Sequence, residues 1–517
     1  MKLGSLLAGI ALRYADREAV ICEDRRISFR ALNATANRIA NGLLKHGFRT
    51  GDRIALYLSN SAELVEAMVG VAKCGAIMVP ISTRLTTPEV KFIFEDSQPA
   101  AIFFTPEFRA AARTAAANLN KPLMIAVEGK AEAGEVAMAA LAAEGTPSEP
   151  PYLPVDPDDC LIAYTSGTTG RPKGAIATHF SVCLLHGFMN ATEFGMTDRD
   201  VVMVTTPMAH RTGLGRVVNM IMTGGKLIVM KRFDPKLAVD LIEREKVTVL
   251  GGVPTIVRML MPEIERRPQA LKTLRLIAAT GEVFPVEVKQ RLAKAVPHVG
   301  VYSFYAQTEG GFIAGLRPEE QRDRPHSMGR AVPGIEIRVV DANLNDVPDG
   351  TTGEFLVRCG LPGPSTIMRA YYNRPDATAE TIVQGGWLRT GDVGYRDNDG
   401  YLYFVDRAKD MVVSGGLNIY SKEVELALAE HPAVVEAAVI GIPDPDFGEA
   451  VMAYVEVKSG QRISSEELID HCRERIASYK KPKHVRFLDA LPRTGTGKVM
   501  KGELRKLAAA ERAPAKV

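Results

Sequence analysis

The sequence lacks the features that mark disulfide-rich, zinc-binding and membrane-spanning chains. Its six cysteines are single and scattered, and no two form a Cys-x-x-Cys pair or have metal-ligand spacing. They are Cys22, Cys74, Cys160, Cys183, Cys359 and Cys472. Scattered cysteines are typical of reduced thiols packed in a core. No apolar run reaches the ~18 residues that a spanning helix needs, so we expect no transmembrane segment and a cytoplasmic location.

A strong excess of one charge is also missing. The chain has 64 Lys and Arg against 61 Asp and Glu, a net charge of +3. This balance gives no reason to expect a nucleic acid or an anionic membrane as a partner. The apolar stretch Leu3–Leu12 leads into Arg13 and Asp16 without a cleavage site, and we expect an amphipathic helix there rather than a signal peptide.

The 517 residues are too many for one ordinary core, and the first two-thirds alternate short β runs with helical patterns. Strands are expected at 52–59, 76–81, 100–105, 247–253, 274–279 and 299–304, and helices at 87–97, 234–246 and 285–295. Such alternation is typical of parallel sheets covered by helices, with ligands bound at the strand C-terminal ends. Asn60, with Glu63 three residues later, is expected to cap a further helix.

The sequence pattern changes twice towards the end of the chain. After Ser327, short β runs at 336–340 and 353–358 predict a smaller, mostly antiparallel subdomain. After Asp406, strands at 434–442 and 451–457 accompany a helix capped by Ser464 and Glu467. The fold class is therefore α/β, a large domain of mostly parallel sheets with a small β subdomain, followed by a small α+β domain.

A glycine-rich loop follows the apolar run Cys160–Tyr164. It reads Thr165, Ser166, Gly167, Thr168, Thr169, Gly170, Arg171, Pro172, Lys173 and Gly174. Its glycines let backbone N–H groups turn towards an anion, its hydroxyls add donors, and Lys173 adds a charge. It is not a Walker loop, because glycine rather than Ser or Thr follows Lys173. The loop predicts a polyphosphate site.

These residues resemble the signature loop of the adenylate-forming superfamily, which includes acyl- and aryl-CoA synthetases, peptide-synthetase adenylation domains and beetle luciferases. The resemblance runs in order through nearly the whole chain. Tyr305-Ala306-Gln307-Thr308-Glu309 resembles the second core motif, with Ala306 in place of the usual glycine. The resemblance implies that Tyr305 stacks on adenine, Thr308 contacts the α-phosphate and Glu309 holds Mg2+. One or two carboxylates are what a phosphate-bound Mg2+ requires.

Other motifs resemble the family's nucleotide contacts. Arg389-Thr390-Gly391-Asp392 is similar to the ribose motif, and Arg407 resembles a second ribose contact. Without the resemblance, Thr-Gly-Asp would be read only as a turn. Gly281, Glu282 and Val283 lie where members of the family bind adenine through the backbone.

Two further motifs resemble the family's catalytic segments. Pro207-Met208-Ala209-His210 is similar to the segment whose histidine borders the acyl carboxylate, so His210 is expected to orient that group and shield its charge, without acting as a general base. The run from Pro492 to Lys498 matches the last core motif. By resemblance, Lys498 bridges the substrate carboxylate and the α-phosphate.

The resemblance also implies a mobile C-terminal domain. Its hinge residue corresponds to Lys409, which divides the chain into an adenylation domain at 1–406, a hinge at 407–410 and a mobile domain at 411–517. Gly415 and Gly416 would then face the thiol channel, where glycine allows the pantetheine arm of CoA to approach closely.

These motifs together predict an AMP-forming acid–CoA ligase. It would activate a carboxylic acid with ATP and Mg2+ as an acyl-adenylate, and then transfer the acyl group to CoA. The alternative is an amino-acid or acyl adenylating enzyme that loads a carrier protein, although Thr205–Gly213 has no acidic residue to hold an amino acid's ammonium group. A non-catalytic binder is disfavoured, because the motif residues Lys173, Glu309, Asp392, Arg407 and Lys498 are all present.

The identity of the acid is left open between aliphatic, alicyclic, aromatic and dicarboxylic classes. Arg211 and Arg216 follow His210 closely, and either could receive a second carboxylate. The favoured expectation is that both face solvent or pair with acids elsewhere. The oligomeric state cannot be read from the sequence, which is compatible with a homodimer.

Overall fold

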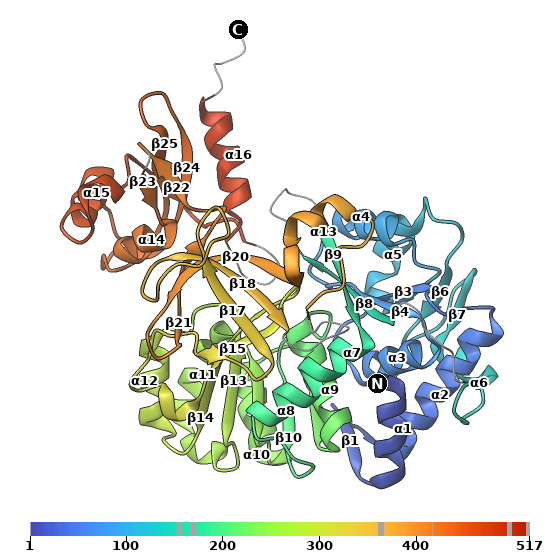
Figure 1. The fold of residues 1–517 in the computed structure, drawn as a ribbon. Helices are drawn as coiled ribbons and strands as arrows, with labels where there is room; N and C mark the ends of the chain where they lie inside the picture. Colours follow the sequence, from blue (N-terminus) through green and yellow to red (C-terminus); the bar gives the residue numbers. More distant parts are fainter. Residues whose placement is uncertain are drawn as a thin grey trace. The chain divides into compact units, whose positions relative to one another are not determined.

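The structure is a computed structural model that describes residues 2–151, 158–165, 172–359, 367–415, 417–493 and 499–512. These residues, drawn in Figure 1 with colours that follow the sequence, divide into two compact units. The first is formed by described residues up to 337 and by 357–388. The second is formed by 338–356 and by described residues from 389 onwards. Each unit is described by itself.

A nine-stranded sheet in the first unit has the order β16-β15-β14-β13-β12-β10-β11-β1-β2. Its strands are β1 (Glu18–Cys22), β2 (Arg25–Ser28), β10 (Val201–Val204), β11 (Lys226–Val229), β12 (Val249–Gly252), β13 (Leu276–Thr280), β14 (Gly300–Gln307), β15 (Gly311–Leu316) and β16 (Arg330–Ala331). Neighbours from β1 to β14 are parallel, whereas β15 runs back against β14. The C-terminal ends of six parallel strands therefore share one edge.

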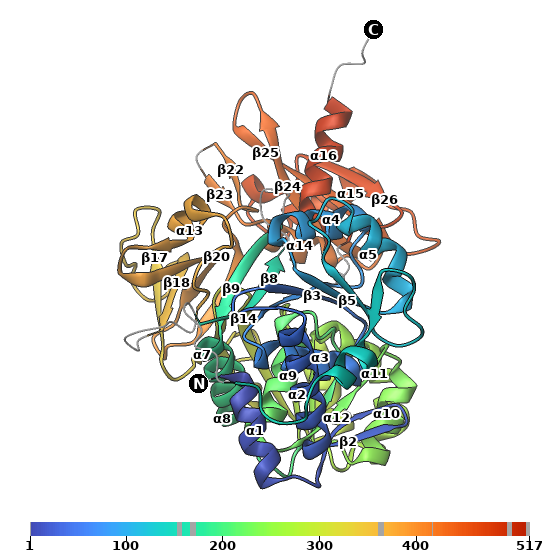
Figure 2. The ribbon, with the colours of Figure 1, turned by 90° about the vertical axis from the view of Figure 1, so that its right-hand side faces the viewer.

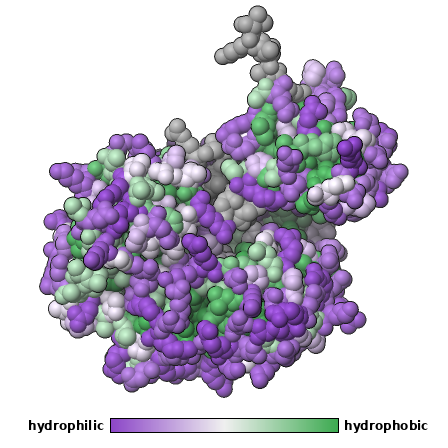
Figure 3. All heavy atoms as spheres, turned by 180° about the vertical axis from the view of Figure 1, so that it is seen from behind, coloured by the Kyte–Doolittle hydropathy of each residue, from purple (hydrophilic) through white to green (hydrophobic). Residues whose placement is uncertain are grey.

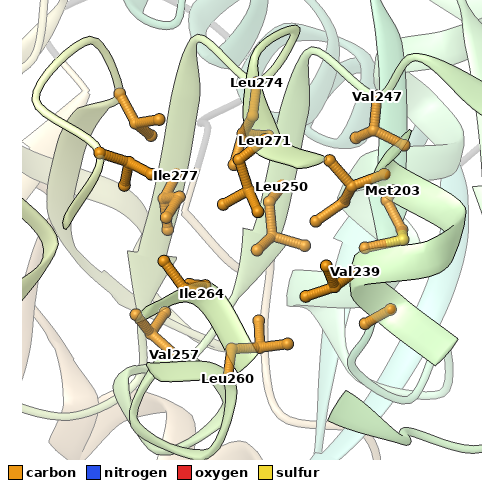
Figure 4. Close-up of a cluster of buried hydrophobic side chains, with 14 of the residues drawn as sticks. Met203, Val239, Val247, Leu250, Val257, Leu260, Ile264, Leu271, Leu274 and Ile277 are labelled. Carbon is orange, nitrogen blue, oxygen red and sulfur yellow. The ribbon is translucent and has the colours of Figure 1, made fainter. Parts of the chain in front are cut away.

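Helices pack on this sheet through apolar faces. They include α9 (Arg211–Thr223), α10 (Pro235–Glu245), α11 (Pro254–Arg266) and α12 (Val286–Ala295). Figure 4 shows Met203, Leu250 and Ile277 of the sheet facing residues of α10 and α11, all within one buried cluster. Helix α10 starts where the sequence predicts, because the Asp234 side chain accepts a hydrogen bond from the Leu237 N–H and Pro235 occupies the first turn.

A seven-stranded sheet, also in the first unit, has the order β7-β6-β5-β3-β4-β8-β9. Its strands are β3 (Arg53–Tyr57), β4 (Ile77–Pro80), β5 (Ala101–Phe104), β6 (Leu123–Ala126), β7 (Glu135–Ala137), β8 (Asp159–Thr165) and β9 (Lys173–Thr178). All neighbours are parallel except β8 and β9. Helices α4 (Thr87–Ser97) and α5 (Arg109–Ala116) lie beside this sheet (Figure 2) and share a buried cluster with it.

The remaining helices of the first unit include three long ones and several short ones. They are α1 (Leu3–Arg13), α2 (Phe29–Lys45), α3 (Ala62–Lys73), α6 (Met138–Glu144), α7 (His179–Val182), η2 (Cys183–Met189), α8 (Asn190–Glu193) and α13 (Pro375–Thr381). Helix α1 confirms the expected N-terminal helix, since its buried residues Leu3, Leu7 and Ala11 lie on one face. The predicted cap of α3 is wrong: Ser61 accepts the bond from the Leu64 N–H. The amide of Asn60 instead binds the backbone of Thr206, Met208 and Met230.

Two smaller sheets complete the fold. One has the order β17-β18-β20-β19, with β21 paired to β20, and contains β17 (Ile335–Val340), β18 (Gly353–Cys359), β19 (Ile382–Val383), β20 (Trp387–Arg396) and β21 (Leu402–Arg407). The other has the order β23-β22-β25-β24, with β26 paired to β25, and contains β22 (Val412–Ser414), β23 (Leu417–Ile419), β24 (Val434–Asp444), β25 (Gly448–Val457) and β26 (His484–Leu488). The fold class predicted from the sequence is confirmed.

Helices α14 (Ser421–Ala429), α15 (Ser465–Arg473) and α16 (Lys501–Arg512) belong to the second unit. The capping box of Ser464 and Glu467 is present at α15, as predicted. All six cysteines are buried free thiols. None of the helices described here is long and apolar enough to span a membrane. The face drawn in Figure 3 is mainly hydrophilic, with smaller hydrophobic areas.

Candidate active site

The hairpin of β8 and β9 carries the two ends of the glycine-rich loop. Thr165 and Lys173 are paired residues at the end of the hairpin next to the loop. Gly174 must lack a side chain, because a Cβ there would lie 3.0 Å from the Tyr164 ring and 2.6 Å from Ile162. The predicted phosphate contacts Ser166, Gly167, Thr168, Thr169 and Gly170 lie outside the described residues.

Glu309 lies in the turn between β14 and β15, where two hydroxyl groups hold its carboxylate. Its Oε1 accepts hydrogen bonds from Thr165 Oγ1 at 3.3 Å and from Tyr371 Oη at 3.0 Å. Lys173 Nζ lies 5.1 Å from the centre of the Tyr371 ring. Burial, together with the charge of Glu309, raises the pKa of Tyr371, so its hydroxyl remains a donor. Three residues predicted from two motifs, Thr165, Lys173 and Glu309, are thus brought together around Tyr371, which was not predicted.

Metal ligands are few around this carboxylate. Within the described ranges, no three His, Cys, Asp or Glu side chains are gathered as a metal-binding group. The two hydrogen bonds from described side chains to Glu309 both end on Oε1. The other oxygen, Oε2, is therefore available for another ligand.

The predicted adenine contacts meet at the C-terminal edge of the nine-stranded sheet. Thr280 of β13 is paired with Phe304 of β14, which places Gly281 next to Tyr305. Gly281 has φ +102°, a conformation that favours glycine. The Glu282 carboxylate accepts bonds from the Thr255 N–H and hydroxyl at 2.7 and 2.6 Å, which fixes the segment to the start of α11. Residues 281–283 are exposed, and Tyr305 is half-buried.

His210 immediately precedes α9 in extended conformation, with φ −100° and ψ 150°. The next residue, Arg211, donates from Nε to His186 Nε2 at 3.1 Å and from Nη1 to the Thr308 carbonyl oxygen. Burial and the two nearby arginines lower the pKa of His186 well below its usual range, so its ring is neutral and can accept this bond. Arg211 therefore links the His210 segment to the Thr308–Glu309 turn, a role that no sequence motif indicated.

The expectation that Arg211 and Arg216 face solvent or pair with acids is wrong. Their exposed fractions are only 9% and 2%. Burial lowers the pKa of each to about 10, so both remain charged at neutral pH. Neither forms an ion pair with a carboxylate of the described residues. Both side chains lie in the protein interior, because their helix, α9, is buried on nearly every side.

The second unit contains the predicted ribose contacts. Asp392 of β20 is paired in register with Arg407 of β21, and Arg407 Nε lies 2.5 Å from Asp392 Oδ1. The Asp392 N–H donates to Thr390 Oγ1 at 3.0 Å, and Thr390 Oγ1 in turn donates to the Phe355 carbonyl at 2.8 Å. The two predicted residues are brought together, and local bonds fix the backbone that carries Asp392.

The predicted hinge segment is bound to α16. Arg505 Nη2 donates to the Lys409 carbonyl at 3.2 Å and lies 2.9 Å from Asp410 Oδ1. Burial lowers the pKa of Lys409. Gly415 has φ +58° and donates its N–H to the Phe447 carbonyl at 2.8 Å. Gly416 and Lys498 lie outside the described residues.

A second link joins α16 to α14. Lys501 Nζ lies 2.6 Å from Glu425 Oε1 and donates to Ser421 Oγ at 2.6 Å. Ser421 Oγ donates to Asp406 Oδ1 at 3.1 Å. Burial raises the pKa of Asp406. One chain of polar contacts thus runs from α16 to the residue before the predicted hinge.

Comparisons with known proteins identify the family of this chain. The model of the AMP-binding enzyme family matches residues 8–372, and that of the AMP-binding enzyme C-terminal domain matches 423–498. The predicted hinge lies between the two ranges. A feruloyl-CoA synthase of an Amycolatopsis species is 36% identical over 93% of this chain and 94% of that protein.

A second relative comes from Rhodococcus jostii and is named 3-[(3aS,4S,7aS)-7a-methyl-1,5-dioxo-octahydro-1H-inden-4-yl]propanoyl:CoA ligase. It is 34% identical over 97% of this chain and 98% of its own length. Among solved structures, ATP-bound MatB from Rhodopseudomonas palustris has a TM-score of 0.87 at 29% identity, covering 98% of this chain and 99% of MatB. The chain therefore belongs to the AMP-binding enzyme family, and it is an acid–CoA ligase that activates a carboxylic acid as an acyl-adenylate and passes the acyl group to CoA.

Proposed function

We propose that the cluster of Thr165, Lys173, Thr308 and Glu309 binds the phosphates of ATP for attack by the acid. The observation that carries this proposal is the Glu309 carboxylate, which two hydroxyl groups hold at the end of the phosphate-loop hairpin. Lys173 supplies positive charge beside it, and Thr308 follows the half-buried Tyr305 on the same strand and turn. Polyphosphate is the ligand that a glycine-rich hairpin end with one lysine is suited to bind.

Mg2+ fits this cluster as a partner of the phosphates. Because Mg2+ keeps several waters and takes few protein ligands, one carboxylate and phosphate oxygens are sufficient. Glu309 supplies that carboxylate, and its Oε2 is not used by the described hydroxyl donors. When bound, the ion would neutralise charge on the phosphate oxygens. Tyr371 and Thr165 hold the carboxylate in position.

Adenine and ribose are assigned to different motifs. Tyr305 and the backbone of Gly281, Glu282 and Val283 lie at adjacent strand ends and would bind adenine. Asp392 would accept hydrogen bonds from the ribose hydroxyls, with Arg407 beside its carboxylate.

Adenylation then needs no covalent enzyme nucleophile. The acid's carboxylate oxygen attacks the α-phosphorus, pyrophosphate leaves, and negative charge develops on the α-phosphoryl oxygens. Preorganised donors and cations stabilise that charge. Thr308 and Lys498 are assigned this role, and His210 orients the acid's carboxylate.

Thioester formation follows when CoA attacks the acyl carbon and AMP leaves. We assign the exchange of groups between the two steps to rotation at 407–410, with Lys409 as the hinge. Gly415 and Gly416 would line the approach of the pantetheine arm, because glycine permits close contact with a ligand.

AMP release tests the function directly. The full chain is incubated with ATP, Mg2+ and one acid at a time, with and without CoA, over short, long-chain, alicyclic, aromatic and dicarboxylic acids. Continuous AMP formation with one class of acid, only when CoA is present, is the expected result. Pyrophosphate exchange with amino acids alone would contradict the CoA ligase and favour the carrier-loading enzyme.

Two variants test whether Lys498 and Lys409 act in different half-reactions. Lys498→Ala should slow adenylation by on the order of 100-fold, the usual effect of losing one donor to a developing oxyanion, and should retain thioester formation from supplied acyl-adenylate. Lys409→Pro should show the reverse pattern. Equal losses in both half-reactions for either variant would refute its assignment.

A further inference from the structure

Arg216 is a buried cation for which the fold leaves space. Its side chain lies on α9, with its guanidinium carbon 5.1 Å from the centre of the Phe194 ring. A Cβ at Gly251 of β12 would lie 2.6 Å from Arg216 Cδ and 3.3 Å from Nε. Any larger residue at Gly251 would displace the arginine. The glycine and the arginine are therefore complementary.

The positive charge of Arg216 is not balanced by the described residues. With its amide oriented so that the oxygen faces Arg216, Asn190 accepts a bond from Nη2 at 3.0 Å. Nε and Nη1 are buried and have no hydrogen-bond partner there. The acid next to Phe194 in the chain, Glu193, instead binds Arg317 and the Tyr302 hydroxyl. No carboxylate of the described residues forms an ion pair with Arg216, and burial lowers its pKa to about 10.

Such an arrangement is costly unless an anion completes it. Removing an unpaired charge from water costs several kcal/mol, and proteins normally neutralise or pair such groups. Arg216 cannot be neutralised near pH 7, because its pKa stays at about 10. The missing component is therefore a negatively charged group that enters with a ligand.

The position of Arg216 identifies that ligand as the acid. Gly251 is next to the last residue of β12, at the edge where parallel strands present ligand-binding loops. His186 and Asn190, which contact Arg211 and Arg216, are four residues apart, so the two guanidinium groups lie about one helical turn apart. The other donor of Arg211 ends on the Thr308 carbonyl. Arg216 thus lies on the same helix as Arg211, which contacts the Thr308–Glu309 turn.

We propose that the acid activated by this enzyme is a dicarboxylic acid whose second carboxylate binds Arg216. This inference rests on the proposed function, in which His210 and Thr308 receive the reacting carboxylate. Arg211 would remain bound to His186 and Thr308 and position the reaction centre, while Nε and Nη1 of Arg216 would donate charge-assisted hydrogen bonds to the far carboxylate.

The test compares dicarboxylic acids of three to eight carbons, and aromatic diacids, with the matched monocarboxylic acids. AMP release in the presence of CoA gives kcat/KM, and thermal shift with acid alone reports binding without the reaction. The wild type should prefer its best diacid to the matched monoacid by at least about 100-fold, since a site built for a charged group strongly rejects an analogue lacking it. A monoacid preferred to every diacid would overturn the proposal.

Arg216→Met replaces the cation with an apolar chain of similar length. It should lower kcat/KM for the diacid by at least about 100-fold, raise it for the monoacid, and abolish the thermal shift caused by the diacid. The variant should unfold at the same or a higher temperature, because an unpaired buried charge has been removed. Arg266→Met, which removes a 54% exposed arginine of α11, is the matched control and should retain the wild-type preference.

The outcomes separate this inference from the proposed function. If monoacids are activated and diacids are not, the ligase stands and the role of Arg216 is refuted. If Arg216→Met loses stability and slows all acids equally, Arg216 is only structural and the proposal fails. If no acid yields AMP, the proposed function fails, while diacid binding that depends on Arg216 would still support the second site.

Discussion

Tyr371 offers the sharpest test of how the phosphate site is built. Its hydroxyl donates to Glu309 Oε1 at 3.0 Å, and its side chain is buried. Tyr371→Phe removes this bond without changing the volume of the side chain, and little water can replace the lost donor. A hydrogen bond to a charged group contributes ~1.5–3 kcal/mol. Since 1.4 kcal/mol corresponds to a factor of ten, adenylation should slow by about 10- to 100-fold.

Tyr164→Phe, on the phosphate-loop hairpin, provides a matched control. The Tyr164 hydroxyl donates to Asp96 Oδ2 at 2.7 Å, so it also binds a carboxylate, here from a half-buried ring. Asp96 is paired with Arg374 and is not part of the proposed phosphate site. The two variants should lose similar stability in chemical denaturation, since each loses one bond of the same kind.

Pyrophosphate exchange with an activated acid isolates adenylation and distinguishes the two variants. Only Tyr371→Phe should lose exchange activity, and adding Thr165→Val should increase the loss, because both hydroxyl groups hold the same oxygen. Wild-type exchange in Tyr371→Phe would refute the reasoning. So would equal losses in Tyr371→Phe and Tyr164→Phe, which would indicate a general effect on the hairpin.

Three further predictions concern stability. Lys501→Met breaks the 2.6 Å ion pair with Glu425. The local stability of α14 and α16, measured by hydrogen exchange, should fall by about 3 kcal/mol. Burial lowers the pKa of His179 from 6.5 to about 4. The neutral ring therefore contributes up to about 3 kcal/mol to the free energy of unfolding above pH 6.5, and this contribution is lost as the pH falls towards 4. The free energy of unfolding from chemical denaturation should depend less on pH in His179→Leu. Gly311→Ala forces a side chain into φ +69° and places Cβ 2.3 Å from Leu185 Cδ1, and should cost about 2–4 kcal/mol in denaturation.

Each of these has a control at a permissive position. Lys506→Met removes a 74% exposed lysine of α16 and should change hydrogen exchange by less than about 0.5 kcal/mol. His326 is exposed, and His326→Leu should keep the wild-type pH dependence. Gly9→Ala lies within α1 with no atom within 4 Å of the new Cβ and should stabilise the helix by up to about 1 kcal/mol. A control that behaves like its test variant would contradict the stated cause.

Local sequence patterns predicted most of the elements because those elements depend on neighbouring residues. The helix expected at 87–97 is α4, and the strands expected at 100–105 and 274–279 are β5 and β13 with ends shifted by up to two residues. The cap at Ser464 was predictable for the same reason. Asn60 was not, because its amide bonds to backbone groups at least 146 residues away.

The site shows the same limit. Motifs predicted that Thr165, Lys173 and Glu309 belong to one site, and the described structure brings them together. They could not predict Tyr371, which contacts Glu309 across 62 residues of chain, or Arg211, which contacts Thr308 across 97. These contacts arise from the packing of separate strands and helices, and no local periodicity encodes them.

Arg216 shows what a sequence can indicate when burial is read from a whole helix. An arginine is normally expected to reach solvent, and that general tendency led to the wrong expectation here. The sequence of α9 is apolar or small at most positions around Arg216, and a helix that is apolar on all sides is buried. A charged residue in such a helix has no exposed face to turn towards, so its partner must come from the protein or from a ligand. Among the described residues, only Asn190 accepts a hydrogen bond from Arg216. The proposed partner of the remaining donors is the substrate, so the burial of α9 would determine which acid the enzyme selects.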